Sequence, residues 1–271
     1  MFRFMAIAVL AVGSAQARDY LIEAGDVAGL VAAVELANEA PGPDRIFLSP
    51  RATYVFESPA PGHPHLALPP IRDDLDLVGN RATLRRYSDH PFSHIEVSRS
   101  ARLRLVAVTL ADGADGSLRN FGELLLWHAI VEDNAGGGTH AALVNFGTAR
   151  VLDSRIRFNS FSSTGRFGGA VVNFGSLEMV DSAMYGNSAY GSVGTIEMGA
   201  ALSNFGTCEL RGVTINAHQT SQGQVGAGAI ANFFPGRLQM TDSVVEANLP
   251  AAIAEVPGDG IGESTGTRFA R

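Results

Sequence analysis

Apolar and polar residues alternate with a period of two in short runs over most of this chain. Within residues 147–160, Ala149 and Val151 alternate with polar or outward neighbours, and Ile156 and Phe158 alternate with two arginines. Successive residues of a β-strand point to opposite faces, whereas a helix repeats every ~3.6 residues. An Asp-Ser pair separates the two runs and is typical of a turn. The pattern therefore predicts short strands joined by tight turns.

These strands belong to a repeat marked by an Asn-Phe pair. The pair begins at positions 120, 145, 173, 204 and 232, so its steps are similar but unequal. A period of roughly 20–50 residues is typical of solenoids, in which each repeat stacks on the next. Three short strands in each repeat describe one turn of a parallel β-helix, so we predict an all-β solenoid. Equivalent residues should then stack as two structural ladders, one of asparagines (Asn120, Asn145, Asn173, Asn204, Asn232) and one of phenylalanines (Phe121, Phe146, Phe174, Phe205, Phe233).

One segment near the N-terminus has helical periodicity instead. Val27, Leu30 and Val34 share one face, Asp26 can act as the N-cap, and a Pro-Gly-Pro sequence follows. We predict a helix over residues 26–39 that caps the open end of the stack. The expected order is then N-terminal coils over 45–119, Asn-Phe-Gly repeats over 120–249, and a C-terminal cap or tail over 250–271. Strands in the N-terminal coils are expected at 45–48, 53–56, 75–78, 95–97 and 103–110.

Residues 1–17 have the composition of a secretory signal peptide. Arg3 gives a basic start, residues 5–12 are apolar, and Ala15-Gln16-Ala17 is a small-x-small cleavage triplet. We predict a mature protein that begins at Arg18, forms a single domain over 18–271 and is secreted or periplasmic. No later apolar run reaches the length of a membrane span. The net charge of −7 and the lack of a basic cluster argue against a nucleic-acid partner.

Composition limits the chemistry further. All 20 basic residues are arginine and there is a single cysteine, so the chain has no lysine base and no internal disulfide. Cys208 shares an alternating position with Ala149 and Leu177, which predicts a core residue. His63 and His65 lack a third ligand, so we predict no metal site and no cofactor, with Ca²⁺ left as an open alternative.

Two parts of the sequence resemble known proteins. Residues 29–38 lie where one family has a Ser-Leu-Arg-Glu-Ala-Ile helix, and residues 43–48, 68–71 and 79–84 resemble its first coils. These features resemble bacterial secreted right-handed β-helix proteins of the CSLREA-domain kind. Residues 168–171 (Gly-Gly-Ala-Val) are similar to the Gly-Gly-Ala-Ile repeat of polymorphic outer-membrane proteins. The resemblance implies a right-handed parallel β-helix and a secreted or surface location.

The spacing within the repeats locates a first candidate site. A second turn position (Asn134, Asn159, Asn187, His218, Asn248) follows the first Asn at a constant step in every repeat except the last. The other arc varies in length, from its shortest at 134–145 to its longest at 187–204. Variable loops on one edge of a solenoid often form its binding face, although tolerated drift would give the same pattern. The candidate contacts with a polysaccharide or cell-surface partner are His140, Arg166, Tyr190, Glu197, Gln219 and Gln222.

A second candidate site is a turn position that carries Asp153, Asp181 and Asp242. Carboxylates stacked on successive coils could act as an acid–base pair or bind Ca²⁺. Each Asp is followed by Ser, however, so an Asx turn accounts for the column structurally. His128 and Gly212 occupy the same place in two other repeats.

Three functions fit this sequence. The favoured hypothesis is a non-catalytic β-helix that interacts with surfaces or glycans through the variable-loop edge. The second is a polysaccharide-active enzyme (a lyase, hydrolase or epimerase) with the pectin-lyase-like fold, for which fold analogy alone is a weak argument. The third is a purely structural secreted repeat protein.

Overall fold

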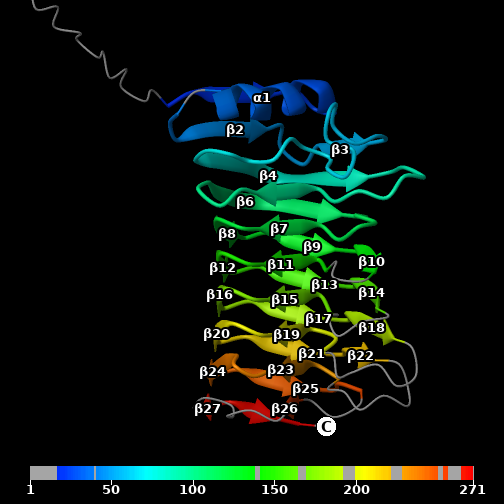
Figure 1. Cartoon of the computed structure of the whole chain (residues 1–271), viewed down its shortest axis with the longest axis vertical. Helices are drawn as coiled ribbons and strands as arrows, with labels where there is room; N and C mark the ends of the chain where they lie inside the picture. Colours follow the sequence, from blue (N-terminus) through cyan, green and yellow to red (C-terminus); the bar gives the residue numbers. More distant parts are fainter. Residues whose placement is uncertain are drawn as a thin grey trace, which may run out of the picture.

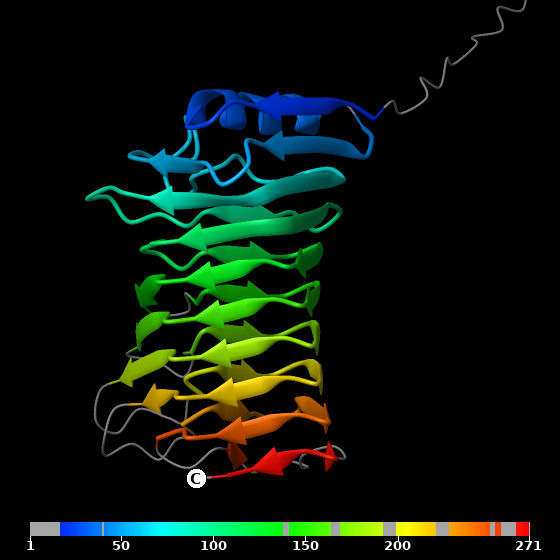
Figure 2. The same cartoon turned by 180° about the vertical axis from the view of Figure 1, so that it is seen from behind.

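The computed structural model describes residues 17–39, 41–137, 141–163, 169–191, 199–220, 228–249, 253–255 and 264–270. They form a parallel β-solenoid of about eight turns with one helix (Figure 1). The strands of successive turns stack along the long axis, with the helix at one end and the C-terminus at the other (Figures 1 and 2). The predicted all-β parallel solenoid is confirmed.

Within the repeats, the largest sheet takes two strands from each turn, and these strands pair in register with their equivalents. Its first strands are β8 (Glu123–Trp127), β12 (Thr148–Leu152), β16 (Ser176–Val180), β20 (Thr207–Arg211) and β24 (Arg237–Thr241). Its second strands are β9 (Ile130–Glu132), β13 (Arg155–Arg157), β17 (Ala183–Tyr185), β21 (Thr214–Asn216) and β25 (Val244–Glu246), and β27 (Ser264–Thr265) and β28 (Arg268–Phe269) follow.

Two smaller sheets close the turns. One holds β5 (Ile95–Val97), β7 (Leu118–Asn120), β11 (Leu143–Asn145), β15 (Val171–Asn173), β19 (Leu202–Asn204), β23 (Ile230–Asn232) and β26 (Ile253–Glu255). The other holds β10 (Ala135–Gly137), β14 (Ser160–Ser163), β18 (Ser188–Gly191) and β22 (Gln219–Thr220), at the start of the variable arc.

The helix α1 (Val27–Glu39) lies across the N-terminal end of the stack (Figure 1). Asp26 Oδ1 accepts a hydrogen bond from the Gly29 amide at 2.8 Å, as expected of an N-cap. Leu30 and Val34 are fully buried, so the helix covers apolar surface that the first turns would otherwise expose. The helix contacts β1 (Asp19–Ile22), β2 (Asp44–Leu48) and β3 (Thr53–Phe56). The strand β1 was not predicted.

Two predicted strands of the N-terminal coils are parts of longer ones. Residues 75–78 begin β4 (Leu75–Arg86), and residues 103–110 lie inside β6 (Arg102–Ala111). The register between β4 and β6 shifts between Val78 and Ala82, where Asn80 and Arg81 have φ of 51° and 66°. The chain bends there without leaving the sheet.

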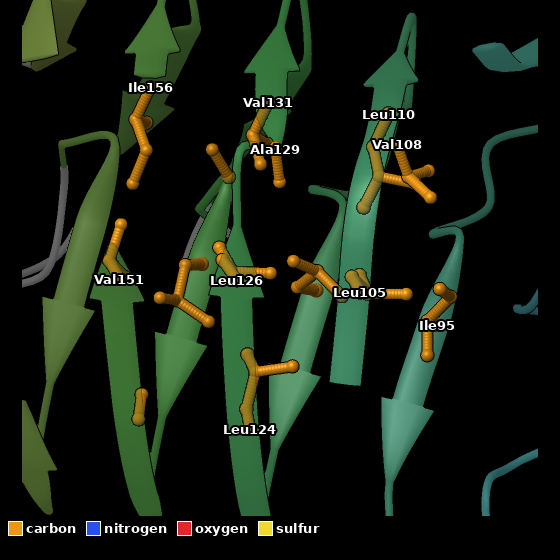
Figure 3. Packing of buried hydrophobic residues seen from close by; sticks show 14 of the residues in the cluster. Ile95, Leu105, Val108, Leu110, Leu124, Leu126, Ala129, Val131, Val151 and Ile156 are labelled. Atoms are coloured by element: carbon orange, nitrogen blue, oxygen red, sulfur yellow. The ribbon is translucent and has the colours of Figure 1, made fainter. Parts of the chain in front are cut away.

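The core is a continuous apolar column inside the turns. Leu105, Leu126, Val131, Val151 and Ile156 point into the space between the sheets (Figure 3), and all are at most 1% exposed. Cys208 on β20 is also 1% exposed, and burial raises the pKa of its thiol, so it is the predicted small core residue.

Both predicted ladders are present as continuous stacks. Along the first asparagine column, each Nδ2 donates to the Oδ1 of the next turn's asparagine at 2.7–2.8 Å. The phenylalanine rings stack with centroid separations of 4.2–5.1 Å. Buried amides bonded on both sides satisfy turn backbone that would otherwise be unpaired, which is a structural role.

Candidate functional site

In each turn, the part of the chain that belongs to the large sheet bends at a residue with positive φ. In the repeats this residue is His128, Asp153, Asp181, Gly212 or Asp242, with φ of 52°, 47°, 48°, 61° and 48°. In earlier turns Arg51, Arg81 and Ala107 take the same left-handed conformation. Asp and Gly are among the residues that tolerate it best. Stacking these bends produces a line of equivalent positions along the outside of the solenoid.

Two adjoining cavities, of about 610 Å³ and about 470 Å³, lie along this line. The larger is lined by Arg81, Ala107, Thr109, His128, Ile130, Asp153 and Arg155. The smaller is lined by His128, Asp153, Ser154, Arg155, Asp181, Ser182, Ala183, Gly212 and Thr214. Because they share His128, Asp153 and Arg155, we treat them as one site, the bend groove.

The charged side chains of the bend groove lack partners among the described residues. Arg81, Asp153, Arg155 and Asp181 are exposed, and none of their side chains makes a hydrogen bond or ion pair in that part of the chain. The Asp181 Oδ1 would lie 2.5 Å from a Cβ placed on Gly212, so this carboxylate leans over the next turn. The groove therefore presents charges that are free to bind a ligand.

The serine that follows each Asp takes the structural role that the sequence suggested for the Asp. Ser154 Oγ donates to the Leu152 carbonyl at 2.7 Å and accepts from the Ala129 amide of the preceding turn at 3.0 Å. Ser182 repeats this arrangement. The Asx-turn interpretation is thus wrong for the described residues, because the serine hydroxyl makes the bonds and the carboxylate makes none. Asp suits the bend through its backbone conformation alone.

Two other arginines on the flanking strands, Arg150 and Arg157, are in contrast paired with carboxylates of adjacent turns. Arg150 Nε lies 2.6 Å from Glu178 Oε2, and Arg157 Nη2 lies 2.6 Å from Glu132 Oε2. Asp153 and Asp181 stack on adjacent turns as like charges, since the residues around them pair in register. Like charges directly opposite each other are destabilising. The charges of the bend groove thus differ from Arg150 and Arg157 in lacking a partner among the described residues.

An aromatic surface borders the groove. Trp127, the only tryptophan of the chain, ends β8 and is 39% exposed. Its ring stacks on His128 with centroids 5.2 Å apart and an interplanar angle of 27°. Trp127 is not among the site residues predicted from the sequence, although it directly precedes the turn residue His128 of the candidate column.

Most of the predicted loop-edge site lies outside the described residues. This applies to His140, Arg166, Glu197 and Gln222. Tyr190 on β18 is 44% exposed, and Gln219 on β22 is exposed. Both strands belong to the four-stranded sheet, so the structure brings these two residues to one edge but not to the bend groove. Asp242 lies in the same bend column but does not line either cavity.

A larger cavity, of about 800 Å³, lies near the ends of β3 and β4 and is a weaker candidate. Arg85 Nε is paired with Asp112 Oδ2 at 2.7 Å. Arg86 donates to the His90 carbonyl at 2.6 and 3.0 Å. Its cations are therefore already engaged within the protein. Among the described residues, no group of three His, Cys, Asp or Glu side chains could hold a metal ion, and no helix could span a membrane.

Comparison with known proteins assigns this parallel β-solenoid to no family. No family model, no curated protein and no solved structure matches it. The resemblance to CSLREA-domain proteins therefore rests on the sequence motifs alone. The bend groove is the feature of the described residues from which a function can be argued.

Proposed function

We propose that this protein is a non-catalytic, extracytoplasmic β-solenoid that binds glycans in the bend groove. The observation that carries the proposal is the set of unpaired charges, Asp153, Arg155 and Asp181, that converge on one open cavity. Carboxylates accept hydrogen bonds and guanidinium groups donate them, so together they suit ligands rich in hydroxyl groups. Trp127 adds an exposed apolar face beside them. A concave site with a few convergent polar groups is the usual form of a small-ligand site.

The extracytoplasmic location is supported by the sequence of residues 1–17. Their basic start, apolar stretch and small-x-small triplet are typical of exported proteins. A groove that is open to solvent over several turns also suits an extended polymer better than a small metabolite. Both features agree with a protein that meets polysaccharides outside the cytoplasm.

The proposal is tested by a glycan array followed by calorimetric titration of the glycans that bind. We expect the double variant Asp153→Asn/Asp181→Asn to bind at least about 10-fold more weakly, because hydrogen bonds to charged groups are stronger than those to neutral ones. Asp242→Asn is the matched control, since it changes an Asp in the same conformation outside the cavities. Equal loss in both variants, or no binding by the unmodified protein, would contradict the proposal.

One observation favours catalysis as a second candidate. Asp153 and Asp181 lie on adjacent turns, which are ~4.8 Å apart in a parallel sheet. The carboxyl groups of retaining glycosidases lie about 5–5.5 Å apart. If the groove were catalytic, the glycans that bind would yield new reducing ends or unsaturated products. Such products, abolished by Asp153→Asn or Asp181→Asn but not by Asp242→Asn, would establish a polysaccharide-active enzyme instead.

A further inference from the structure

We infer that the bend groove selects a zwitterionic glycan, one that carries both acidic and free amino groups. The inference rests on the proposed function and names the ligand class of the same site. Its basis is the order of charges along the groove. From the N-terminal end, the bend column carries Arg51 and Arg81, then the uncharged Ala107, and later Asp153 and Asp181.

The two cavities divide these charges. The cavity nearer the N-terminus is lined by Arg81 and Arg155 with one carboxylate, that of Asp153. The cavity nearer the C-terminus is lined by Asp153 and Asp181 with one cation, that of Arg155. Within the described part of the chain, no ion pair joins Asp153 to Arg155. One end therefore attracts an anion and the other a cation.

The chemistry of each end fixes the group it prefers. A guanidinium group that lacks a partner binds a carboxylate through two parallel N–H donors, which a hydroxyl group satisfies less well. Two stacked carboxylates repel each other until a cation lies between them, and an ammonium group supplies both the charge and three donors. A polymer with one kind of charge would satisfy one cavity and be repelled by the other.

The test uses hyaluronan oligosaccharides in three forms. The native form has carboxylates and N-acetyl groups, the de-N-acetylated form has carboxylates and amines, and the de-N-acetylated, carboxyl-reduced form has amines only. In calorimetric titrations we expect the second form to bind about 10-fold more tightly than either of the others. The preference should weaken at high salt. Failure of the zwitterionic form to bind best would overturn the inference.

Variants assign each preference to one end of the groove. Arg81→Gln/Arg155→Gln should remove the advantage of the carboxylate, and Asp181→Asn that of the amine, while Asp242→Asn should change neither. Equal binding of all three forms would overturn the inference and leave the proposed function standing. Absence of binding to any glycan on the array would overturn the proposed function and the inference together.

A separate observation at the N-terminal end carries a second inference. We infer that removal of residues 1–17 places the new N-terminal ammonium group on the buried carboxylate of Asp44 and locks the N-terminal end of the solenoid. The Arg18 backbone nitrogen already lies 2.7 Å from Asp44 Oδ1, and Arg18 Nη2 lies 2.8 Å from Asp44 Oδ2. Asp44 is 1% exposed, and Arg18 Nη2 also donates to the Leu36 carbonyl of α1 at 2.7 Å.

Hydrolysis of the Ala17–Arg18 bond would change the chemistry of this contact. Water adds across the peptide bond, the carboxylate leaves with Ala17, and the Arg18 nitrogen becomes a charged ammonium. A hydrogen bond from an uncharged amide to the buried carboxylate is thereby replaced by one from an ammonium group, so that donor and acceptor both carry charge. Because Arg18 joins β2 and α1 at the start of β1, the added attraction stabilises the cap at the end that would otherwise fray.

Three chains test the lock: one that begins at Arg18, one with a single Gly before Arg18, and the Arg18 chain acetylated at its N-terminus. We expect the free Arg18 chain to unfold about 4 °C higher than the other two. Its α-amino pKa should lie above the usual ~8. In an Asp44→Asn background the differences between the chains should vanish. Equal unfolding temperatures of the three chains, or an exported protein whose mass shows another start, would overturn the inference.

Discussion

At the residue scale, His218 shows how the second turn ladder tolerates a different side chain. It occupies the place of an asparagine between Asn187 and Asn248 and is 1% exposed. Its Nδ1 accepts from the Asn187 amide at 3.2 Å, as an Asn Oδ1 does elsewhere in the ladder. Its Nε2 lies 3.0 Å from the Met184 carbonyl and takes the donor role of Asn Nδ2. Both bonds require a neutral ring protonated at Nε2, and burial lowers the pKa of His218 to about 4.

This histidine makes stability depend on pH. Between pH ~6.5 and about 4, the unfolded chain holds a proton on His218 that the folded chain excludes, so the free energy of unfolding decreases as the pH falls. The upper bound of the loss is about 3 kcal/mol. His94, whose pKa burial also lowers to about 4, adds a similar dependence. In urea titrations at pH 7 and pH 5, His218→Asn should lose less stability on acidification than the unmodified protein; an unchanged difference would contradict the assignment.

A substitution inside the asparagine ladder that begins at Asn120 should lower the stability more, and this loss should not depend on pH. Asn173 Nδ2 donates to Asn204 Oδ1 at 2.8 Å and to the Thr207 carbonyl at 3.0 Å, and its side chain accepts from Asn145 at 2.8 Å. Asn173→Ala leaves buried groups above and below without partners and should cost about 3 kcal/mol in urea unfolding. Phe146→Ala, at a 45% exposed position of the neighbouring stack, should cost less. A smaller loss in Asn173→Ala than in Phe146→Ala would contradict the structural role of the ladder.

At the residue scale, the candidate site could be predicted from the sequence only in part. The Asp column was found from its spacing, because equivalent turn positions in a repeat must stack. The sequence could not show that the carboxylates form no hydrogen bond in the turn, because in an Asp-Ser pair either side chain can make that hydrogen bond. Only the positions of Ser154 and Ser182 relative to the preceding turn show that the serine makes it.

At the element scale, prediction succeeded where periodicity was strong. The helix was placed almost at its observed bounds, and the strands of the repeats followed from their alternation. The N-terminal coils were harder, because Gly79 and Asn80 are typical of a turn while the sheet in fact continues through a bend. The strand β1 escaped notice because it lies next to the cleavage triplet and has only 4 residues. Its partner in β2, and not its own pattern, makes it a strand.

The variable arc gives the prediction that separates the two candidate binding faces. Replacing residues 192–198 with a short Gly-Ser linker alters the segment that follows β18 and leaves all the lining residues of the bend groove in place. Glycan affinity in calorimetry should therefore stay within about 2-fold of the unmodified value. A loss of about 10-fold or more would transfer the site to the loop edge, where Tyr190 is the exposed aromatic residue. Removal of the Tyr190 ring by Tyr190→Ala is the companion measurement.

At the scale of the whole molecule, each turn contacts mainly its neighbours. Stability in such a solenoid is close to a sum of repeat and interface contributions, so a whole repeat can be removed if the register is kept. The in-register pairing of β12 with β16 and of β20 with β24 predicts that the repeats are interchangeable at their interfaces. This property allows the groove to be altered without changing the rest of the rod.

Two deletions of equal length test whether a repeat can be removed. They have equal length because the step from Asn145 to Asn173 is the same as the step from Asn204 to Asn232. Deletion of residues 145–172 removes Asp153 and Arg155, and deletion of 205–232 leaves both, together with Asp181. We expect both shortened chains to unfold cooperatively at lower urea concentrations than the unmodified protein. Only the second should bind glycans, since only it retains these three charges of the groove. Equal affinity of the two deletions would show that ligand recognition does not depend on the bend groove, whereas failure of either to fold would show that the repeats are not interchangeable.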